Sequence, residues 1–481
     1  MLLKTTSQSL AAQLAARLSE RMVTGLLAAG SRLPSVRQCA QQQGVSPSTV
    51  VAAYDQLQAQ GLIEAQRNRG FYVRNRAAAH VNAALTASNS VVDSGTPAPA
   101  SGFEAQHRPV NATALIRGMF HSGSDKLQPG LGAFPPEWLQ TSFLSAAVRR
   151  VTSGAQLQAW SLQYGEPAGD IGLRQALSGR LNAMAIAAAP GHIVTTVGAT
   201  HALDIISRTL LKAGDYVMVE EPGWAIEFAR LDALGLRILP VPRGPDGPDQ
   251  VVMARYCELH APKLFVSVSV LHNPTGYCLS PSAAHRILQL AHQQQFHIVE
   301  DDTYSHLAPE HVTRMSALDG LQRCIYVSGF SKILVPGWRI GYLAAPPDLV
   351  ERLLDTKLLT TLTTPALLEK ALAWCIDQGL LRRHAQQVRT RLDQARSRSV
   401  KLAQAAGCTF VAPAAGLFGW VDTGVDTDAL AQRMLDLGYL LAPGGLFFAN
   451  RVPSTLMRIN FCTTQDAAFW QVFSQVRGQM G

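Results

Sequence analysis

The chain has 481 residues, enough for about three domains, and hydrophobic residues make up 47% of it while charged residues make up 16%. This balance excludes a mainly disordered or fibrous chain. There is no run of about 18 apolar residues and no apolar signal-peptide core, so we expect neither a membrane span nor secretion. The seven cysteines are scattered and include no Cys-x-x-Cys pair, which favours buried thiols in the cytoplasm over disulfides or a metal site.

The positive charge is unevenly distributed along the chain. Residues 1–76 contain nine Lys and Arg against three Asp and Glu, a net charge of +6, whereas the remaining 405 residues contain 33 against 31, a net charge of +2. A small basic module beside a near-neutral body is typical of a protein that binds a polyanion such as DNA. An ordinary basic surface would account for the charge equally well, so the motifs have to distinguish the two.

Three regions differ in composition. Residues 1–76 contain helical patterns followed by a hairpin, residues 77–114 are rich in Ala, Ser, Asn, Thr and Pro and predict a flexible linker, and residues 115–481 alternate short apolar runs with longer helical patterns. Strands that alternate with helices predict an α/β fold in which a mostly parallel sheet is covered on both faces. The clearest predicted strands are Ile193–Val197, Tyr216–Glu220, Leu264–Ser269, Ile298–Glu300 and Cys324–Ser328.

The first region predicts three helices. Apolar residues at every fourth position from Leu10 to Met22 form one buried stripe. The residues Gly30 to Pro34 interrupt the helical pattern, and Ser35 after them is placed to cap the second helix. After a tight turn, Ser46 suits the N-cap of a third helix and Pro47 suits its first position.

The third helix and the hairpin after it carry groups that could contact a polyanion. Ser48 and Thr49 lie on the exposed first turn of the helix, where small hydroxyls reach base edges or phosphates. Two strands are predicted on either side of a tip that carries Arg67 and Arg69. Two arginines at one tip repel each other unless an anion binds them. The pattern favours a winged helix-turn-helix over a helical dimerisation domain with solvated arginines.

These motifs resemble a known family. The runs LPSVR at 33–37, GVSPSTV at 44–50 and GLIE at 61–64 are similar to the GntR family of winged-helix transcription factors, over nearly all of residues 8–76. Pro47 and Val51 stand where some relatives have arginines, so the resemblance implies no base preference. It implies that double-stranded DNA is contacted by Arg37, Ser46, Ser48, Thr49, Arg67 and Arg69.

Four motifs of the large region follow predicted strands. They are Gly-Ala-Thr-His at 198–201, His-Asn-Pro-Thr-Gly at 272–276, Glu-Asp-Asp-Thr-Tyr at 300–304, and the segment 331–339, which begins Ser-Lys and ends in Arg. The first begins a helix and offers free backbone N–H groups to an anion. In open α/β sheets, ligands bind at the carboxyl ends of the strands, so the four motifs are expected at one edge.

Together these residue types match the needs of pyridoxal 5′-phosphate (PLP). Its aldehyde needs an unprotonated amine, its pyridine nitrogen needs a buried anion, and its phosphate needs an arginine and backbone amides. Taken singly, each residue has an ordinary explanation: Asp301 as a helix cap, Lys332 as a surface lysine, Arg339 as a salt-bridge partner. Their joint occurrence after successive strands favours the cofactor.

The large region is similar to fold-type I PLP enzymes of the aspartate aminotransferase class, over roughly residues 125–470. The resemblance implies a mostly parallel seven-stranded sheet with a smaller α+β C-terminal subdomain. It implies Lys332 as the Schiff-base lysine, with Asp301 and Tyr304 as the other catalytic residues. It implies that Arg458 binds a substrate α-carboxylate, and that Asn273, also substrate-binding, holds the phenolic oxygen of PLP together with Tyr304. The cofactor-binding residues that it implies are Lys332, Asp301, Tyr304, Asn273, Trp224, Ala199, Thr200, Ser331, Arg339 and, from a partner subunit, Tyr164.

One position departs from the family pattern. Three residues before the lysine the family commonly has a hydroxyl that helps to hold the phosphate, and here the residue is Gly329. We therefore expect one phosphate hydrogen bond to be lost or replaced by water.

A GntR-type module, a linker and an aminotransferase-like domain together resemble the MocR subfamily of regulators. The resemblance implies a cytoplasmic, homodimeric transcriptional regulator whose large domain senses PLP or an amino compound through an aldimine at Lys332. One alternative is an active PLP-dependent aminotransferase acting on an amino acid, and a third is a sensor of PLP itself. The sequence names neither the effector nor the operator.

Overall fold

The computed structural model describes residues 9–23, 27, 30–66, 70–74, 128–153, 156–309 and 311–480. The predicted linker at 77–114, and the hairpin-tip residues Arg67 and Arg69, lie outside these residues. The chain divides into two compact units, an N-terminal one and a large one whose described part begins at residue 128.

The N-terminal unit is a winged helix-turn-helix, as the sequence predicts. Its antiparallel β-hairpin pairs Ile63 with Val73. Leu14, Tyr54 and Leu57, from the first and third helices, are fully buried in one apolar cluster. The elements are α1 (Leu10–Val23), α2 (Val36–Gln43), α3 (Pro47–Ala59), β1 (Ile63–Gln66) and β2 (Gly70–Val73).

Two serine caps fix the helix-turn-helix geometry. The Ser35 hydroxyl accepts a hydrogen bond from the Gln38 N–H, and the Gln38 side chain reciprocates in a capping box. The Ser46 hydroxyl accepts from the Thr49 N–H at 3.2 Å, and Pro47 occupies the first turn of α3. Both predicted caps are therefore confirmed.

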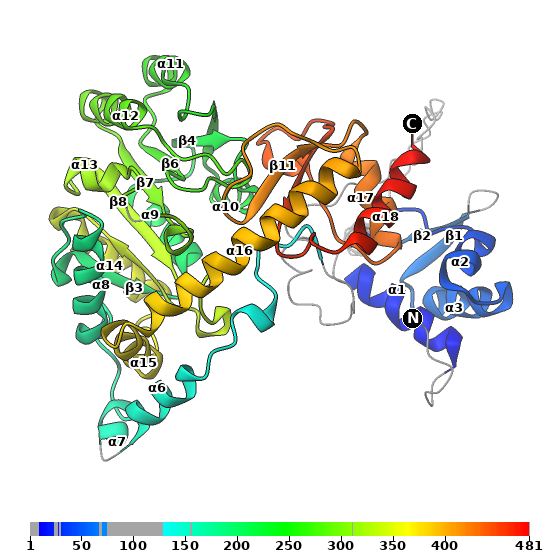
Figure 1. The fold of residues 1–481 in the computed structure, drawn as a ribbon, viewed down its shortest axis with the longest axis horizontal. Coiled ribbons are helices and arrows are strands. Elements are labelled where there is room, and N and C mark those ends of the chain that lie inside the picture. The colour runs from blue at the N-terminus through cyan, green and yellow to red at the C-terminus, as the bar shows by residue number, and fades with distance from the viewer. Residues whose placement is uncertain are drawn as a thin grey trace, which may run out of the picture. The chain divides into compact units, whose positions relative to one another are not determined.

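The large unit is built on a seven-stranded sheet, shown in Figure 1. The strand order is β3-β9-β8-β7-β6-β4-β5, and only β9 runs antiparallel to its neighbours. All five strands predicted from the sequence are present, with ends shifted by no more than two residues. The strands are β3 (Ile193–Thr196), β4 (Tyr216–Glu221), β5 (Arg237–Pro242), β6 (Leu264–Ser267), β7 (His297–Asp301), β8 (Cys324–Gly329) and β9 (Gly341–Ala344).

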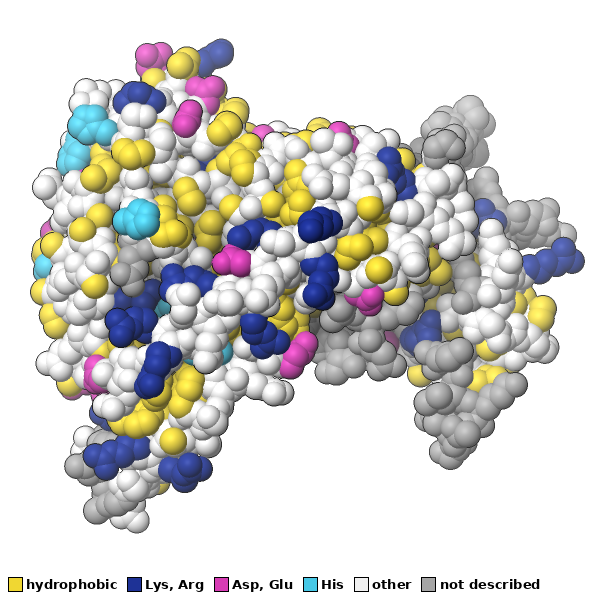
Figure 2. All heavy atoms as spheres, viewed as in Figure 1, with side chains coloured by type: hydrophobic (Ala, Val, Ile, Leu, Met, Phe, Trp, Pro, Cys, Tyr) yellow, Lys and Arg dark blue, Asp and Glu magenta, His cyan; other side chains and the backbone are white. Residues whose placement is uncertain are grey.

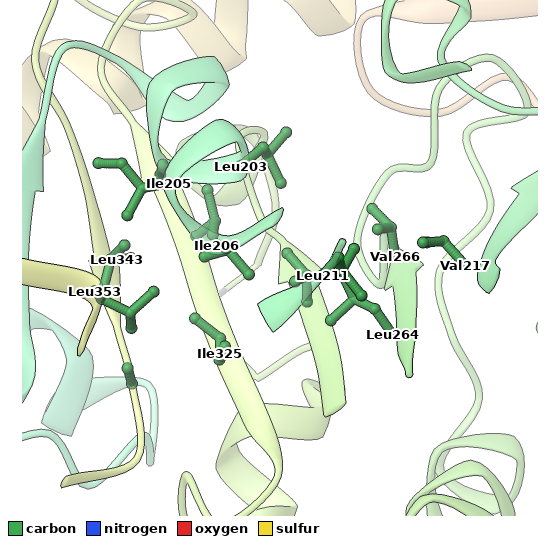
Figure 3. Close-up of a cluster of buried hydrophobic side chains, with 14 of the residues drawn as sticks. Leu203, Ile205, Ile206, Leu211, Val217, Leu264, Val266, Ile325, Leu343 and Leu353 are labelled. Carbon is green, nitrogen blue, oxygen red and sulfur yellow. The ribbon is translucent and has the colours of Figure 1, made fainter. Parts of the chain in front are cut away.

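Strand alternation divides the core into two clusters, one on each face of the sheet. On β4, Val217 and Val219 lie in one cluster, whereas Met218 between them lies in the other. The first cluster, shown in Figure 3, packs against α9 (Ala199–Leu210), α10 (Ala225–Ala233) and α14 (Pro347–Thr360). The second packs against α11 (Gln250–His260), α12 (Pro281–Gln294) and α13 (Met315–Asp319). Helices cover both faces, as predicted.

A smaller antiparallel sheet follows in the chain, with the order β10-β11-β13-β12. Its strands are β10 (Thr409–Phe410), β11 (Phe418–Asp422), β12 (Ala442–Pro443) and β13 (Leu456–Asn460). The further helices are α6 (Phe143–Thr152), α7 (Gln156–Ser161), α8 (Ile171–Ala183), α15 (Ala366–Asp377), α16 (Leu380–Ala405), α17 (Thr427–Asp436) and α18 (Ala467–Gly478). None of the described helices is long and apolar enough to cross a membrane.

The cap of α3 leads to a test by substitution. We expect Ser46→Ala to lower the free energy of unfolding of the N-terminal unit by about 1 kcal/mol, because the Thr49 N–H loses its acceptor. Ser48→Ala, on the same exposed turn, should change it by no more than about 0.5 kcal/mol. Urea unfolding measured by circular dichroism compares the two; equal effects would contradict the capping role.

Candidate functional site

The candidate site lies at the carboxyl ends of parallel strands in the large unit. Asp301 ends β7, Lys332 follows β8, and the turn before α9 follows β3. The electrostatic interactions of these residues connect them: Arg458, Arg339 and Asp301 all influence the Lys332 amine. The topology therefore brings the predicted catalytic residues to one edge of the sheet.

The fold makes the side-chain amine of Lys332 a weaker base than that of an ordinary lysine. Burial, together with the smaller effects of the charges of Arg458 and Arg339, lowers its pKa to about 8, and the charge of Asp301 opposes this lowering. The neutral amine is therefore a few hundred times more abundant near neutral pH than for an ordinary lysine. Its Nζ donates a hydrogen bond to the Gly132 carbonyl at 2.7 Å. Such an amine can attack an aldehyde.

Three consecutive acids end β7, and the structure separates their roles. Glu300 is buried and accepts hydrogen bonds from the N–H groups of Met315 and Ser316. Asp302 is buried and pairs with Arg314 at 2.6 Å. These two carboxylates are therefore used by the fold itself.

Asp301 differs from both neighbours. In the part of the chain that the structure describes, its carboxylate has hydrogen bonds only from the N–H and hydroxyl of Thr303. Burial, with smaller contributions from the charges of Glu227 and Asp302, raises its pKa to about 6, and the hydrogen bonds from Thr303 oppose this rise. A cationic ring nitrogen beside Asp301 would relieve that cost.

Arg458 and Asn273 form the opposite side of the site. On β13, Arg458 donates from Nη1 to Asn273 Oδ1 at 3.0 Å and from Nη2 to the Gly130 carbonyl at 2.6 Å. Its guanidinium carbon lies 4.3 Å from the centre of the Phe418 ring. Its buried Nε has no partner among the described residues, and burial lowers its pKa to about 10.

Tyr304 is buried beside the same aromatic side chain. Its ring meets Phe418 edge to face, with centroids 5.7 Å apart. Burial raises the pKa of its phenol, while the charge of Arg458 opposes this rise. The phenol therefore remains protonated near neutral pH and can donate a hydrogen bond.

Residues 129–133, which we call the strap, were not singled out from the sequence. The strap carbonyls of Leu131 and Ala133 accept hydrogen bonds from the Asn460 side chain at 2.9 and 2.7 Å. The carbonyls of Gly130 and Gly132 are the acceptors for Arg458 and Lys332. A Cβ on Gly130 would come within 2.5 Å of the Leu441 backbone, so glycine permits this close approach. The Pro-Gly-Leu-Gly run at 129–132 was the available signal.

The turn before α9 forms a cradle for an anion. Gly198 has φ +85° and caps α9 without a side-chain acceptor, and no described residue accepts the N–H groups of Ala199 and Thr200. Arg339 donates to the Val197 carbonyl at 3.2 Å and borders Gly198 so closely that a Cβ there would lie 2.5 Å from Nη2. These residues therefore converge as the sequence predicts.

Gly329 also faces this cradle. A Cβ on Gly329 would lie 3.5 Å from the Ala199 nitrogen, so a side chain at this position would border the anion site. The missing hydroxyl is therefore relevant to phosphate binding, and its effect on affinity stays a prediction. Ser331, beside Lys332, is half-buried.

His201 is a site residue that the sequence argument quoted without assigning a role. Its Nδ1 accepts a hydrogen bond from the Val197 N–H at 3.1 Å, and its Nε2 lies 2.9 Å from the Thr361 hydroxyl. Burial lowers its pKa. His201 therefore ties the anion turn to the end of α14.

Two predicted cofactor residues are not connected to the others by a described contact. Trp224 lies at the start of α10 and packs partly against the apolar cluster of Figure 3. Tyr164 lies in the loop before α8 and is 85% exposed. Their roles, stacking on the ring and reaching a partner's phosphate, stay predictions.

In the N-terminal unit, four of the predicted DNA-contacting residues lie within the described part of the chain, at or near the surface. Arg37, Ser46 and Ser48 are exposed, and Thr49 is half-buried at the start of α3. The Ser46 hydroxyl is also shared with the hydroxyls of Ser48 and Thr49, each at 2.8 Å. The first turn of α3 therefore presents a compact group of hydroxyls.

Comparison with known proteins agrees with both units. Residues 138–469 match the family Aminotransferase class I and II, and residues 10–73 match the bacterial regulatory proteins of the gntR family. YisV, an HTH-type transcriptional regulator of Bacillus subtilis, is 28% identical over 93% of this chain and 92% of its own. The probable rhizopine catabolism regulatory protein MocR of Rhizobium meliloti is 31% identical over 78% of this chain and 73% of its own. The structure of Pyrococcus horikoshii kynurenine aminotransferase, in complex with PMP, has a TM-score of 0.69 and 25% identity over 76% of this chain and 94% of its own.

A winged helix-turn-helix joined to an aminotransferase-like domain defines a class of DNA-binding transcriptional regulators. This chain has both parts, each matched by its own family. It belongs to the GntR-type regulators of the MocR subfamily, and its large domain belongs to the aminotransferase class I and II family.

The unpaired carboxylate leads to a prediction about pH. The folded pKa of Asp301, about 6, lies above its ordinary value of 3.8, so the wild type loses stability as the pH rises from about 4 to 6. Asp301→Asn should therefore stabilise the cofactor-free protein at about pH 7.5, by at most about 3 kcal/mol, and have little effect near pH 4. Thermal unfolding at both pH values measures this.

Glu300→Gln is the control for this prediction. It should destabilise the protein at about pH 7.5, because the Glu300 carboxylate accepts two backbone N–H groups. If both substitutions destabilised the protein equally, Asp301 would be a structural carboxylate like its neighbour.

Proposed function

We propose that this regulator acts in the cytoplasm, that it binds PLP at Lys332, and that an amino compound entering the same site changes its binding to DNA. The residues present fit the cofactor: a buried amine of lowered pKa, a carboxylate with no cationic partner among the described residues and an uncapped glycine turn at one sheet edge. The similar kynurenine aminotransferase holds PMP. When bound, PLP supplies an aldehyde and an electron-withdrawing ring.

The residues of this chain divide the work of holding the two ligands. Lys332 would offer its neutral amine to the aldehyde of PLP, and Asp301 would hold the proton on the ring nitrogen. Arg339 and the N–H groups before α9 bind the phosphate. Arg458 binds the carboxylate of an amino acid through its two Nη groups, and Asn273 orients that guanidinium.

The strap is the observation that carries the regulatory proposal. Of the four strap carbonyls with side-chain donors, two are held by Asn460 and two by Lys332 and Arg458. Lys332 is the group that an aldehyde would react with, and Arg458 is the group that a carboxylate would bind. Occupation of the site therefore removes two of the strap's hydrogen bonds.

The strap's place in the sequence connects this event to DNA. The strap begins at residue 129, close after the predicted linker that follows the winged helix. We expect a ligand that loosens or reorders the strap to change the position from which the chain leads back to the linker. This gives the ligand a different affinity for two conformers, which thermodynamic coupling requires.

A DNA-binding titration tests this proposal. The probe is a duplex that the protein itself enriches from a random-sequence library, and the titrants are PLP alone and PLP with a panel of amino acids and amines. We expect at least one amino compound to change the apparent Kd about fivefold or more. Lys332→Ala should abolish the change and still bind the duplex.

Lys357→Met is the matched control for Lys332→Ala. Lys357 is also buried with a pKa lowered to about 8, but it donates to the Pro167 carbonyl, outside the site. The Lys357→Met protein should keep both the PLP absorbance and the DNA response. A response that persists in Lys332→Ala would contradict the proposal, and so would a Kd that no compound changes.

A working aminotransferase is the second candidate. It is favoured by the arrangement in which Arg458 and Asn273 are hydrogen-bonded and Tyr304 lies beside them. Stopped-flow absorbance of the PLP-loaded protein with an amino acid distinguishes the two. Rapid, complete conversion to PMP, with turnover on a keto acid, would favour the enzyme.

We further propose that the large unit forms a homodimer. Leu359 is 90% exposed at the end of α14, and Leu362 beside it is also exposed. The loop that carries exposed Leu162 and Tyr164 runs alongside, because a Cβ on Gly165 would lie 3.5 Å from the Thr364 carbonyl. A second copy would remove this apolar surface from water and give Tyr164 a neighbouring site to reach.

The dimer can be tested by placing a charge in this surface. Leu359→Asp should give a monomer in sedimentation velocity, because an interface cannot bury an unpaired carboxylate. Val251→Asp is the control, since Val251 on α11 is 80% exposed and lies outside the surface. If Leu359→Asp sedimented as the wild type does, this surface would not be the interface.

A further inference from the structure

Helix α16 concentrates positive charge in a domain that is otherwise acidic. Its 26 residues contain seven Lys and Arg and one Asp, a net charge of +6. Residues 77–481 as a whole contain 33 basic and 31 acidic residues. Without α16 they would contain 33 − 7 = 26 and 31 − 1 = 30, a net charge of −4. The near-neutral average of the large region therefore hides one strongly basic helix.

Part of this charge has a structural role. Arg391 stacks over the Trp138 ring at 4.5 Å, Arg396 pairs with Asp393 at 2.6 Å, and Arg389 donates to the Ala308 carbonyl at 3.2 Å. Arg391 and Arg389 connect α16 to its neighbours within the large unit, whereas the Arg396–Asp393 pair lies within the helix and Arg396 reaches outside it through the Gly416 carbonyl at 3.5 Å.

The remaining charge has no such role. Arg382, Arg398 and Lys401 are exposed and have neither a hydrogen bond nor an ion pair within the described parts of the chain. Arg382 and Arg383 also stand in the first turn of α16, where the helix dipole disfavours positive charge, and no acid stands with them. Helix stability therefore does not explain them.

The distance along α16 over which the free charges extend is comparable to one turn of a DNA duplex. Arg382 and Lys401 are 19 positions apart, which is roughly 28 Å along a helix, and one turn of B-DNA is about 34 Å. Figure 2 shows Lys and Arg side chains spaced along the exposed side of α16. Around the helix, Arg382 and Arg398 lie about 160° apart with Lys401 between them, so the free cations are spread over the exposed side of α16 rather than aligned in one row. Cations spread in this way on a rigid rod can approach phosphates on a DNA backbone.

We propose that the exposed basic face of α16 binds the sugar-phosphate backbone of duplex DNA that flanks the site held by the winged helix. The partner is DNA rather than an acidic protein, because the same chain already carries a DNA-binding domain and so holds a duplex at high local concentration. The contact carries no base specificity. It adds affinity and salt dependence to a complex whose sequence preference the N-terminal unit sets.

The test removes three charges that have no structural contact. In Arg382→Gln/Arg398→Gln/Lys401→Gln, binding of the full chain to the library-selected duplex, extended by about 15 base pairs on each side, is measured across a range of salt. The slope of log K against log salt should become smaller in magnitude by about 2 to 3, and binding at about 0.1 M salt should weaken at least tenfold. Hydroxyl-radical footprints should shorten at the flanks.

The matched control removes the same charge elsewhere on the large unit. Arg237, Arg255 and Arg286 are also exposed, on β5, α11 and α12. Their triple substitution to Gln changes net charge identically, so it should leave the slope and the footprint as in the wild type. The α16 variant should keep the wild-type thermal midpoint and PLP absorbance. The control variant should keep the PLP absorbance, and its midpoint should fall slightly, because Arg237 loses its hydrogen bond to the Tyr216 hydroxyl and Arg286 loses its hydrogen bond to Gln250.

Two results would overturn the proposal. An unchanged slope in the α16 variant would show that its basic face does not contact DNA, and an acidic protein surface would then be the partner to seek. Equal reductions in both variants would show a general charge effect without a contact at α16. Neither result depends on whether PLP or an amino compound regulates the protein.

Discussion

Two buried cations that reach toward one segment are the constraint on which the candidate site depends. Burial and, to a smaller extent, the nearby charge of Arg458 lower the pKa of Lys332 to about 8. Arg458 stays charged and is satisfied by the Asn273 oxygen, the Gly130 carbonyl and an aromatic ring. No carboxylate pairs with either amine or guanidinium in the described structure. Such a site is complementary to a ligand that brings its own phosphate and carboxylate.

The local features of the fold could be predicted from the sequence because they depend on neighbouring residues. Serine before a helix-forming run specifies a cap, and both Ser35 and Ser46 cap as expected. Strand positions followed from short apolar runs, and the number of strands and their mostly parallel direction followed from the family resemblance. Asp301 was chosen from the Asp-x-x-Tyr pattern, and the structure adds the reason: Glu300 and Asp302 are already paired with other elements.

What the sequence did not reveal depends on contacts between residues far apart in the chain. The strap meets Lys332 and Arg458 across 200 and 328 positions. No local pattern predicts which main-chain carbonyl a buried donor selects. His201 was visible in its motif, yet its role required knowing that Thr361 lies beside it. The basic face of α16 was hidden for another reason, because a regional net charge averages it with acids elsewhere.

The strap and the basic helix act on DNA binding in different ways. A contact by α16 that is the same in every conformer strengthens binding but cannot respond to a ligand, since coupling requires a difference between conformers. In the proposed mechanism the strap would provide such a difference, because its carbonyls already hold Lys332 and Arg458 and a ligand would have to compete for them. Three hydrogen bonds from Asn460, two from its side chain and one from its backbone, remain in either case and limit how far the strap can move. Reciprocity then requires that DNA binding alter the affinity of the large domain for its amino compound by the same factor.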